Sequence, residues 1–224
     1  AAGAGLYIEG GSACLVAGTV IGNQSDYDGG GLYLDGADAV LARTVVSGNQ
    51  ASVGSGGGLY VRLGGAELSN VVIRDNRAGV SGAGIWIEGD GMSSAALTHV
   101  TLAENTDGDG TGVFVSSGRA AITNGVVVSH TVGIMVSQSG EAAVDGVLWY
   151  GNAAANTDGT GTINVTGAVT GPPRFQGDGY HLQPASSAID QGVATDLSTD
   201  IDLEPRFDTP DLGVDEIWLP GELE

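Results

Sequence analysis

The sequence predicts an all-β fold, a right-handed parallel β-helix (β-solenoid) of six to seven coils that ends in an irregular C-terminal cap. Three observations lead to this prediction. One phrase recurs six times between Leu6 and Asn152, its positions alternate with the two-residue period of a strand, and 40 of the 224 residues are glycine. Self-similarity on this length scale is typical of solenoids.

The recurring phrase closes on an asparagine, and histidine takes this place once. Leu6, Leu32 and Leu59 each follow a glycine and each lie seventeen residues before their asparagine. An amide at the same turn of every coil can hydrogen-bond its copies above and below. We therefore interpret the column as a structural ladder made of Asn23, Asn49, Asn76, Asn105 and Asn152, with His130 in the fifth coil.

Each phrase contains three short strands separated by glycine-rich turns. The first strand has aliphatic residues two positions apart, such as Leu32 and Leu34, which a strand places on one face. The second strand carries alanine at one position in every copy, and we assign this column to the core: Ala13, Ala39, Ala66, Ala95, Ala120 and Ala142. No helical periodicity accompanies these patterns. Equivalent strands therefore stack about 4.8 Å apart, and the handedness of parallel crossovers predicts a right-handed coil.

Repetition stops near Gly167, and five of the six prolines follow within the next stretch of chain. Proline is rare in central strands. The sequence thus predicts repeats over residues 1–167 and a capping region over 168–224, which we expect to wrap or close the C-terminal end of the stack and protect its edge. The sequence begins inside the repeated phrase, so we expect further coils before Ala1.

Two stretches resemble known families. Gly-Gly-(Leu/Ile)-aromatic followed by (Val/Ile/Leu)-x-x-Asn is similar to the repeat of polymorphic outer-membrane proteins, with aliphatic residues where that family usually has Phe. The tail, with Gly177–Leu182, Ser186–Gly192 and Asp211–Glu216, resembles the ending of choice-of-anchor Q β-helix proteins. The resemblance implies a secreted bacterial or archaeal protein at the cell surface. It implies no activity.

The charge excludes several classes of partner. The 27 acidic residues and seven basic residues, all of them Arg, give a net charge of −20. Nucleic acid and anionic membranes need a basic face, and polyuronate substrates are disfavoured for the same reason. No apolar run is long enough for a membrane span. Cys14 is the one cysteine, so no intramolecular disulfide can form.

An aromatic column is the candidate binding site. It lies between the inward aliphatic positions of the first strand, so alternation points it outward, and it consists of Tyr7, Tyr33, Tyr60, Trp86 and Phe114. Rings at the coil spacing would make a narrow platform for sugar rings or a partner protein. Alternatively the rings pack on one another or under the tail and only stiffen the coils.

Aspartates in the turns are the candidate cation ligands. Asp26 and Asp28, and again Asp107 and Asp109, form half of a calcium loop without its closing glutamate. Ca²⁺ is the one cofactor that these residues suggest, and solvated turn carboxylates are the alternative. A second cluster in the tail comprises Asp200, Asp202, Asp211 and Asp215, and we expect Arg206 to pair with one of them.

We find no catalytic residues. No adjacent aspartate pair lies on a strand, Lys is absent, and the three histidines lie too far apart in the repeat to form one site. The leading hypothesis is a non-enzymatic extracellular β-helix, a cell-surface structural, adhesive or filament-forming module. Its partners would be a second copy bound end to end, or a surface polysaccharide or protein. The alternative is a polysaccharide-binding or polysaccharide-degrading protein.

Overall fold

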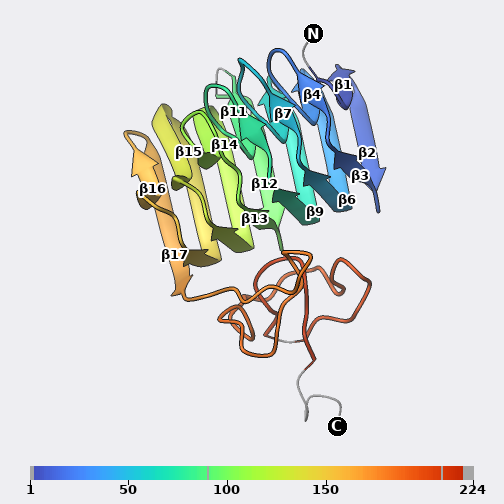
Figure 1. The fold of residues 1–224 in the computed structure, drawn as a ribbon, viewed down its shortest axis with the longest axis vertical. Helices are drawn as coiled ribbons and strands as arrows, with labels where there is room; N and C mark the ends of the chain where they lie inside the picture. Colours follow the sequence, from blue (N-terminus) through green and yellow to red (C-terminus); the bar gives the residue numbers. More distant parts are fainter. Residues whose placement is uncertain (1–2, 90, 208, 219–224) are drawn as a thin grey trace.

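The computed structural model describes residues 3–89, 91–207 and 209–218, and these form one stack of parallel β-coils with an irregular lobe beside it (Figure 1). The described chain contains seventeen strands and no helix. It therefore contains no helix that could cross a membrane. The fold is all-β, as the glycine-rich alternating repeat predicts.

Equivalent strands of successive coils lie side by side. The first strands of coils one to four are β1 (Leu6–Glu9), β5 (Leu32–Asp35), β8 (Leu59–Arg62) and β11 (Ile85–Glu88). The second strands are β2 (Ser12–Val16), β6 (Asp38–Ser47), β9 (Gly65–Arg74) and β12 (Ser94–Thr98). Coils one and four have a separate third strand, β3 (Thr19–Ile21) and β13 (Thr101–Ala103). In coils two and three the second and third strands form one continuous strand, β6 and β9, which passes through the bend.

The last coils run almost without interruption. Coil five is β14 (Thr111–Val128), coil six is β15 (Val132–Tyr150), and a partial seventh coil comprises β16 (Ala155–Gly159) and β17 (Thr162–Thr170). A separate three-stranded sheet lies beside the turn that precedes each first strand, and it consists of β4 (Gln24–Ser25), β7 (Gln50–Ala51) and β10 (Arg77–Ala78).

The pairing follows the register of the repeated phrase. Leu6 pairs with Leu32 and Leu32 with Leu59, and the alanine column pairs in the same way from Ala13 to Ala39 to Ala66. Every ladder between named strands is parallel. Because every copy of the repeat has the same cross-section, the aliphatic columns are buried only when the copies stack in register. The predicted solenoid of six to seven coils is confirmed.

The core is the inside of the coils. Leu32, Leu59, Ile85, Val113 and Ile134 are fully buried, and so are the aliphatic residues two positions further on. The chain turns between second and third strands at a residue with positive φ in each coil, and these bend residues are Ala17, Arg43, Asn70, His99, Asn124 and Gly146. The left-handed conformation costs free energy outside glycine, and here it lets the backbone bend while the strands on both sides keep their pairing.

The alanine column provides a test of the inward assignment. Ala66 is 2% exposed, whereas Val40 on the opposite face is 40% exposed. We expect Ala66→Leu to lower the free energy of unfolding by about 1–3 kcal/mol, because the close-packed core has no room for three more carbons. Val40→Leu should stay within about 0.5 kcal/mol. Denaturant melts of both variants measure this difference, and equal effects would contradict the assignment.

The tail packs on the flank of the stack and not across its end. Leu182, Ala188 and Leu212 join a hydrophobic cluster with Ala103, Val126, Val128 and Leu148 on the outer face of β13–β15. Figure 1 shows this lobe beneath the lower ends of the strands. The expectation that the tail closes the C-terminal end is therefore wrong, since most residues of β17 stay exposed. β17 also continues past the predicted boundary at residue 167, and residues 208 and 219–224 of the predicted capping region lie outside the described residues.

Candidate functional site

The asparagine column forms a continuous ladder of side-chain hydrogen bonds. Each amide nitrogen donates to the amide oxygen of the next rung, at 2.9 Å from Asn23 to Asn49, 2.9 Å from Asn49 to Asn76 and 3.0 Å from Asn76 to Asn105. Each of these amide oxygens also accepts the backbone N–H of the asparagine in the preceding coil. Asn49, Asn76 and Asn105 are fully buried. These three rungs are thus part of the interior and offer no surface to a ligand.

His130 substitutes for asparagine in the fifth rung. Its Nε2 lies 3.1 Å from Asn105 Nδ2, so it must be the acceptor of that bond, and its backbone N–H donates to Asn152 Oδ1. An accepting Nε2 is unprotonated, which requires a neutral ring. Burial of the ring lowers the pKa of His130 to about 4. The ladder therefore needs a neutral histidine at this position.

The aromatic column is a stack of rings. Successive centroids from Tyr7 to Phe114 lie 5.3, 4.8, 6.2 and 4.4 Å apart, with neighbouring planes within 20° of parallel. Tyr60 Oη and Trp86 Nε1 both donate to Glu88 Oε2, at 2.8 and 3.1 Å. Offset stacking and these bonds hold the rings against one another.

The middle of the aromatic column is covered. Tyr33 is 8% exposed and Tyr60 is 5% exposed, whereas Tyr7 in the first coil is 46% exposed. The turn before each ring carries a glycine with positive φ, and a Cβ on Gly29 or Gly56 would lie within 2.8 Å of the Cβ of the following tyrosine. With 8% and 5% of their surface exposed, Tyr33 and Tyr60 offer too little ring surface to stack on a sugar. The predicted outer platform is wrong for Tyr33 and Tyr60, and the packing alternative accounts for them.

The turn aspartates act as backbone acceptors. Asp28 Oδ1 accepts the N–H of Ser55 at 2.8 Å, and Asp109 Oδ1 accepts the N–H of Thr111 at 3.0 Å. Asp107 lies 3.8 Å from the Arg77 guanidinium. Asp26 and Asp28 belong to the turn after coil one, and Asp107 and Asp109 to the turn after coil four, so the two pairs do not combine. Calcium binding at either turn stays a prediction.

A groove runs along the outer face of the second-strand sheet. It has a volume of about 790 Å³ and crosses all six coils, and its residues are small apart from a few charged side chains. The outward positions that line it are Ser12, Asp38, Val40, Gly65, Glu67, Ser94, Ala96, Arg119, Ala121, Glu141 and Ala143. A second hollow of about 540 Å³ shares Val40, Glu67 and Ala96 with it and has the tail segment Thr195–Leu197 as a wall. The tail therefore borders the groove.

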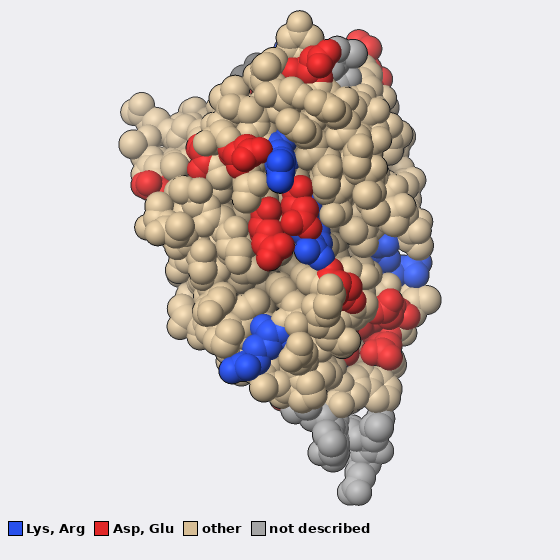
Figure 2. Space-filling model, viewed as in Figure 1, with Lys and Arg blue, Asp and Glu red and all other residues tan. Residues whose placement is uncertain are grey.

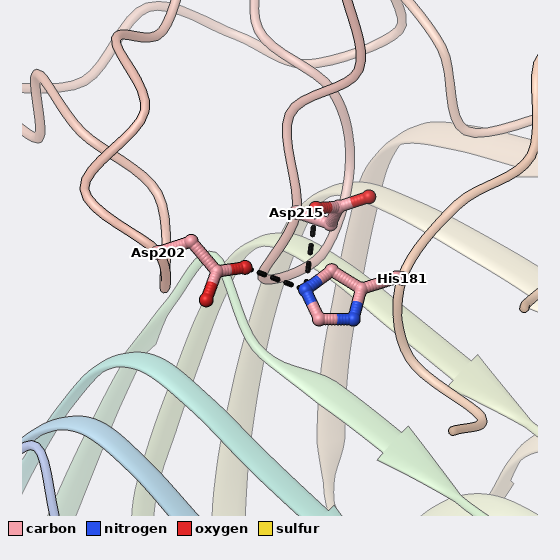
Figure 3. Close-up of side chains that lie close together, drawn as sticks. All are labelled: His181, Asp202 and Asp215. Carbon is pink, nitrogen blue, oxygen red and sulfur yellow. Dashed lines mark hydrogen bonds and ion pairs between the residues drawn. The ribbon is translucent and has the colours of Figure 1, made fainter.

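A separate cluster of ionisable groups lies in the tail. Asp202 and Asp215 both point toward one ring nitrogen of His181 (Figure 3). The Nε2 atom lies 2.5 Å from Asp202 Oδ2 and 3.9 Å from Asp215 Oδ1, and Asp178 Oδ2 contacts Nδ1. Burial alone lowers the pKa of His181, but the hydrogen bonds to Asp202 and Asp178 outweigh it and raise the pKa to about 9.

The other aspartates of the tail face the backbone. Asp200 Oδ1 accepts the N–H groups of Asp202 and Glu204, and Asp211 accepts those of Asp190 and Ile217. Burial raises the pKa of Asp211 to about 7. Arg206 forms its ion pair with Glu216 at 3.0 Å, with both side chains almost fully buried. The prediction of a four-aspartate cation site is therefore wrong for Asp200 and Asp211, whose carboxylates accept backbone N–H groups. Arg206 pairs with a glutamate and not with an aspartate.

One comparison with known proteins identifies the fold family. The family model described as a right-handed β-helix region matches residues 1–149. The chain belongs to the right-handed β-helix family. Neither the curated proteins nor the solved structures contain a significant match. The match covers the repeats and leaves out the tail, and the handedness agrees with the prediction from parallel crossovers. Right-handed β-helix proteins include pectate-lyase-like enzymes and proteins without enzymatic activity, so family membership does not decide between them.

Of the four charged side chains that line the β-helix groove, two form an ion pair and a third accepts a backbone N–H. Arg119 Nε lies 3.2 Å from Glu141 Oε2, and Asp38 Oδ1 accepts the backbone N–H of Gly65 at 2.9 Å. Glu67 is exposed and has no hydrogen bond or ion pair within the described chain. On the face that Figure 2 shows, acidic and Arg side chains likewise lie next to one another on a largely uncharged surface.

The groove was not predicted from the sequence, and in the tail cluster the sequence indicated Asp202 and Asp215 but not His181. Small residues at the outward positions that flank the alanine column, such as Ser94 and Ala96, are the sequence signal for the groove. The core was predicted from the inward columns alone, so these outward positions were not used. His181, Asp202 and Asp215 come from three tail segments outside the repeat. No periodicity indicates that such segments meet.

Proposed function

We propose that this β-helix is a non-enzymatic extracellular module that binds an uncharged, hydroxyl-rich polymer along the outer groove of the second-strand sheet. One observation carries the proposal: the groove crosses six coils and its floor consists of small side chains. At about 4.8 Å per coil it is roughly 24 Å long. A site of that length and shape suits an extended chain better than a compact small molecule.

The polarity of the groove favours a carbohydrate polymer. Ser12 and Ser94 offer hydroxyl groups, and Asp38, Glu67 and Glu141 offer acceptors, while the alanine floor contacts the apolar faces of a sugar. Three carboxylates against the single Arg119 disfavour a polyanion. Because no aromatic side chain lines the groove, hydrogen bonds and shape would supply the affinity, which fits an adhesive contact repeated along a surface.

The arrangement of the acids supports binding without hydrolysis. Glycosidases use two carboxyl groups about 5–9.5 Å apart, one on each side of the scissile bond. Here Glu141 is paired with Arg119 and Asp38 holds a backbone N–H, so Glu67 is the one acid of the described groove without such an engagement. A lone carboxylate lacks the partner that either mechanism requires. End-to-end association through the first coil stays a separate prediction.

Affinity electrophoresis in gels that contain uncharged polysaccharides tests the proposal. We expect retardation of the wild type by at least one such polymer and a loss of affinity of about tenfold or more in Ala96→Trp, since an indole at this exposed position obstructs the floor. Val53→Trp, in an exposed turn outside the groove, is the matched control and should bind as the wild type does.

The same polymers distinguish binding from degradation. Incubation with the wild type should release no new reducing ends. Release that disappears in Glu67→Gln would establish the enzymatic alternative and contradict the proposal. Equal retardation of Ala96→Trp and wild type would remove the groove as the binding site, and absence of retardation in every uncharged polymer would remove the ligand class.

A further inference from the structure

Three separate segments of the tail bring ligand-type atoms together at His181. Asp202 follows the turn that Asp200 caps, Asp215 follows Val214, whose N–H donates to Thr101 of β13, and His181 follows the Asp178 turn. His181 Nε2, one Asp202 oxygen and one Asp215 oxygen all lie within 4.8 Å of one another. The two carboxylates approach the same nitrogen from different sides (Figure 3).

The surroundings hold the imidazole in a fixed orientation. Asp178 Oδ2 contacts Nδ1, and Asp178 Oδ1 accepts the backbone N–H groups of Tyr180 and His181 at 3.2 Å each. Asp215 Oδ2 accepts the N–H of Leu182 at 2.7 Å, which leaves Oδ1 facing the ring. A histidine that binds a metal through one nitrogen usually donates its other N–H to a carboxylate in this way. The contact with Asp178 therefore orients the ring as the second contact of a metal-binding histidine does.

We propose that His181, Asp202 and Asp215 bind a divalent transition-metal ion of the Zn²⁺ type, with Asp178 as the residue that positions His181. Ligand atoms around tetrahedral Zn²⁺, at bond lengths of about 2.0–2.2 Å, lie about 3.3 Å apart. The observed separations from Nε2 are 2.5 Å to Asp202 and 3.9 Å to Asp215. Shifts of under about 1 Å would bring each of these two separations to the metal geometry.

The donor set selects the class of ion. One imidazole nitrogen with two carboxylates suits Zn²⁺ and its first-row neighbours, whereas Ca²⁺ takes six to eight oxygen ligands. A hollow of about 510 Å³ opens beside the three ligands and is also lined by Gln176 and Glu204. This space provides an entry path and room for the water molecules that would complete the coordination.

The ion would fasten three segments of the tail to one another. It would cross-link three segments that otherwise share few backbone hydrogen bonds, and the Asp178 carbonyl already accepts a hydrogen bond from Arg74 at the end of β9. Metal binding to the folded chain alone stabilises the fold by mass action. The site is thus structural in kind and separate from the polymer-binding groove.

Titration of the metal-stripped full chain with Zn²⁺ tests this inference, in physiological salt with excess Mg²⁺ to occupy diffuse acidic sites. We expect one Zn²⁺ per chain and a rise in the melting temperature. His181→Gln and Asp202→Asn should each lower the affinity by about 100-fold, and Asp178→Asn by about 10–100-fold. Glu204→Gln lines the same hollow without belonging to the ligand set, so its affinity should not change.

Co²⁺ absorption supplies a readout that a merely structural role of these residues would not move. Wild type and Asp178→Asn should both show the visible bands of nitrogen-ligated Co²⁺, and His181→Gln should lose them. Equal Zn²⁺ affinity in all variants would place binding elsewhere and overturn the inference. A wild type that binds no Zn²⁺ would also overturn the inference. This holds even if His181→Gln has a lower melting temperature, because the protonated histidine would then be the cation that pairs with the aspartates.

Discussion

Replacement of Asn76 by leucine should destabilise the protein by about 3–5 kcal/mol. Asn76 Oδ1 accepts both the backbone N–H and the side-chain amide of Asn49, and its Nδ2 donates to the Val46 carbonyl and to Asn105. A leucine side chain makes none of these hydrogen bonds, and each buried group that is left without its hydrogen-bond partner costs about 1–3 kcal/mol. Thermal melts should show a fall of roughly 10 °C or more.

Asn23→Leu is the matched control for this ladder experiment. Asn23 is only partly buried, and without its amide Asn49 Oδ1 still accepts the backbone N–H of residue 23. We therefore expect a loss of about 1 kcal/mol or less. A loss in Asn76→Leu no larger than in Asn23→Leu would mean that the interior of the ladder contributes little, and that the aliphatic core alone sets the stability.

The variant His130→Asn should lose less stability in acid than the wild type does. An unfolded chain has the ordinary histidine pKa of 6.5, whereas the buried ring in the folded chain has a pKa of about 4. Above pH 6.5 neither state binds the proton. Between pH 6.5 and about 4 the unfolded state binds it and the folded state does not, so stability falls as pH falls. At 1.36 kcal/mol per pH unit, the wild type should lose about 2–3 kcal/mol by pH 4.5 through this residue.

Melts of wild type and His130→Asn at pH 4.5 and 7.5 measure the effect by difference. His99, with a pKa lowered by burial to about 3, loses stability in the same direction, and Asp211, with a pKa raised by burial to about 7, acts in the opposite direction. Both are present in both proteins and cancel. The same pH dependence in the two proteins would contradict the assignment of a buried neutral ring to the fifth rung.

The repeat made the solenoid predictable. A phrase in constant register determines which strands pair, and the two-residue period determines which side chains face inward, so Ala66 and Leu32 could be placed in the core from sequence alone. The ladder followed from the same register. The burial of Tyr33 did not, because it depends on the turn at Gly29 lying close to the Cα and Cβ of Tyr33, and a glycine column is compatible with several turn geometries.

The tail could not be predicted in the same way. Its contacts join residues far apart in the chain, such as Arg206 with Asn70, and no period signals them. The convergence of Asp202 and Asp215 on His181 likewise depends on how irregular loops fold back on β13–β15. The acids of this region are evident in the sequence as a group, but only coordinates separate Asp202 and Asp215 from the inward-facing Asp200 and Asp211.

The flanking position of the tail changes how the stack can unfold. In a one-dimensional repeat array each coil is coupled only to its neighbours, so opening can begin at any interface and spread. Here the bend residues of three successive coils are bonded to one segment: Asn70 to Thr199, His99 to Thr195 and Asn124 to Val193. Coils three to five are thereby tied into a single cooperative unit. The bends of the first two coils carry Ala17 and Arg43, and within the described chain neither residue is hydrogen-bonded to this segment, so these coils lie outside the unit.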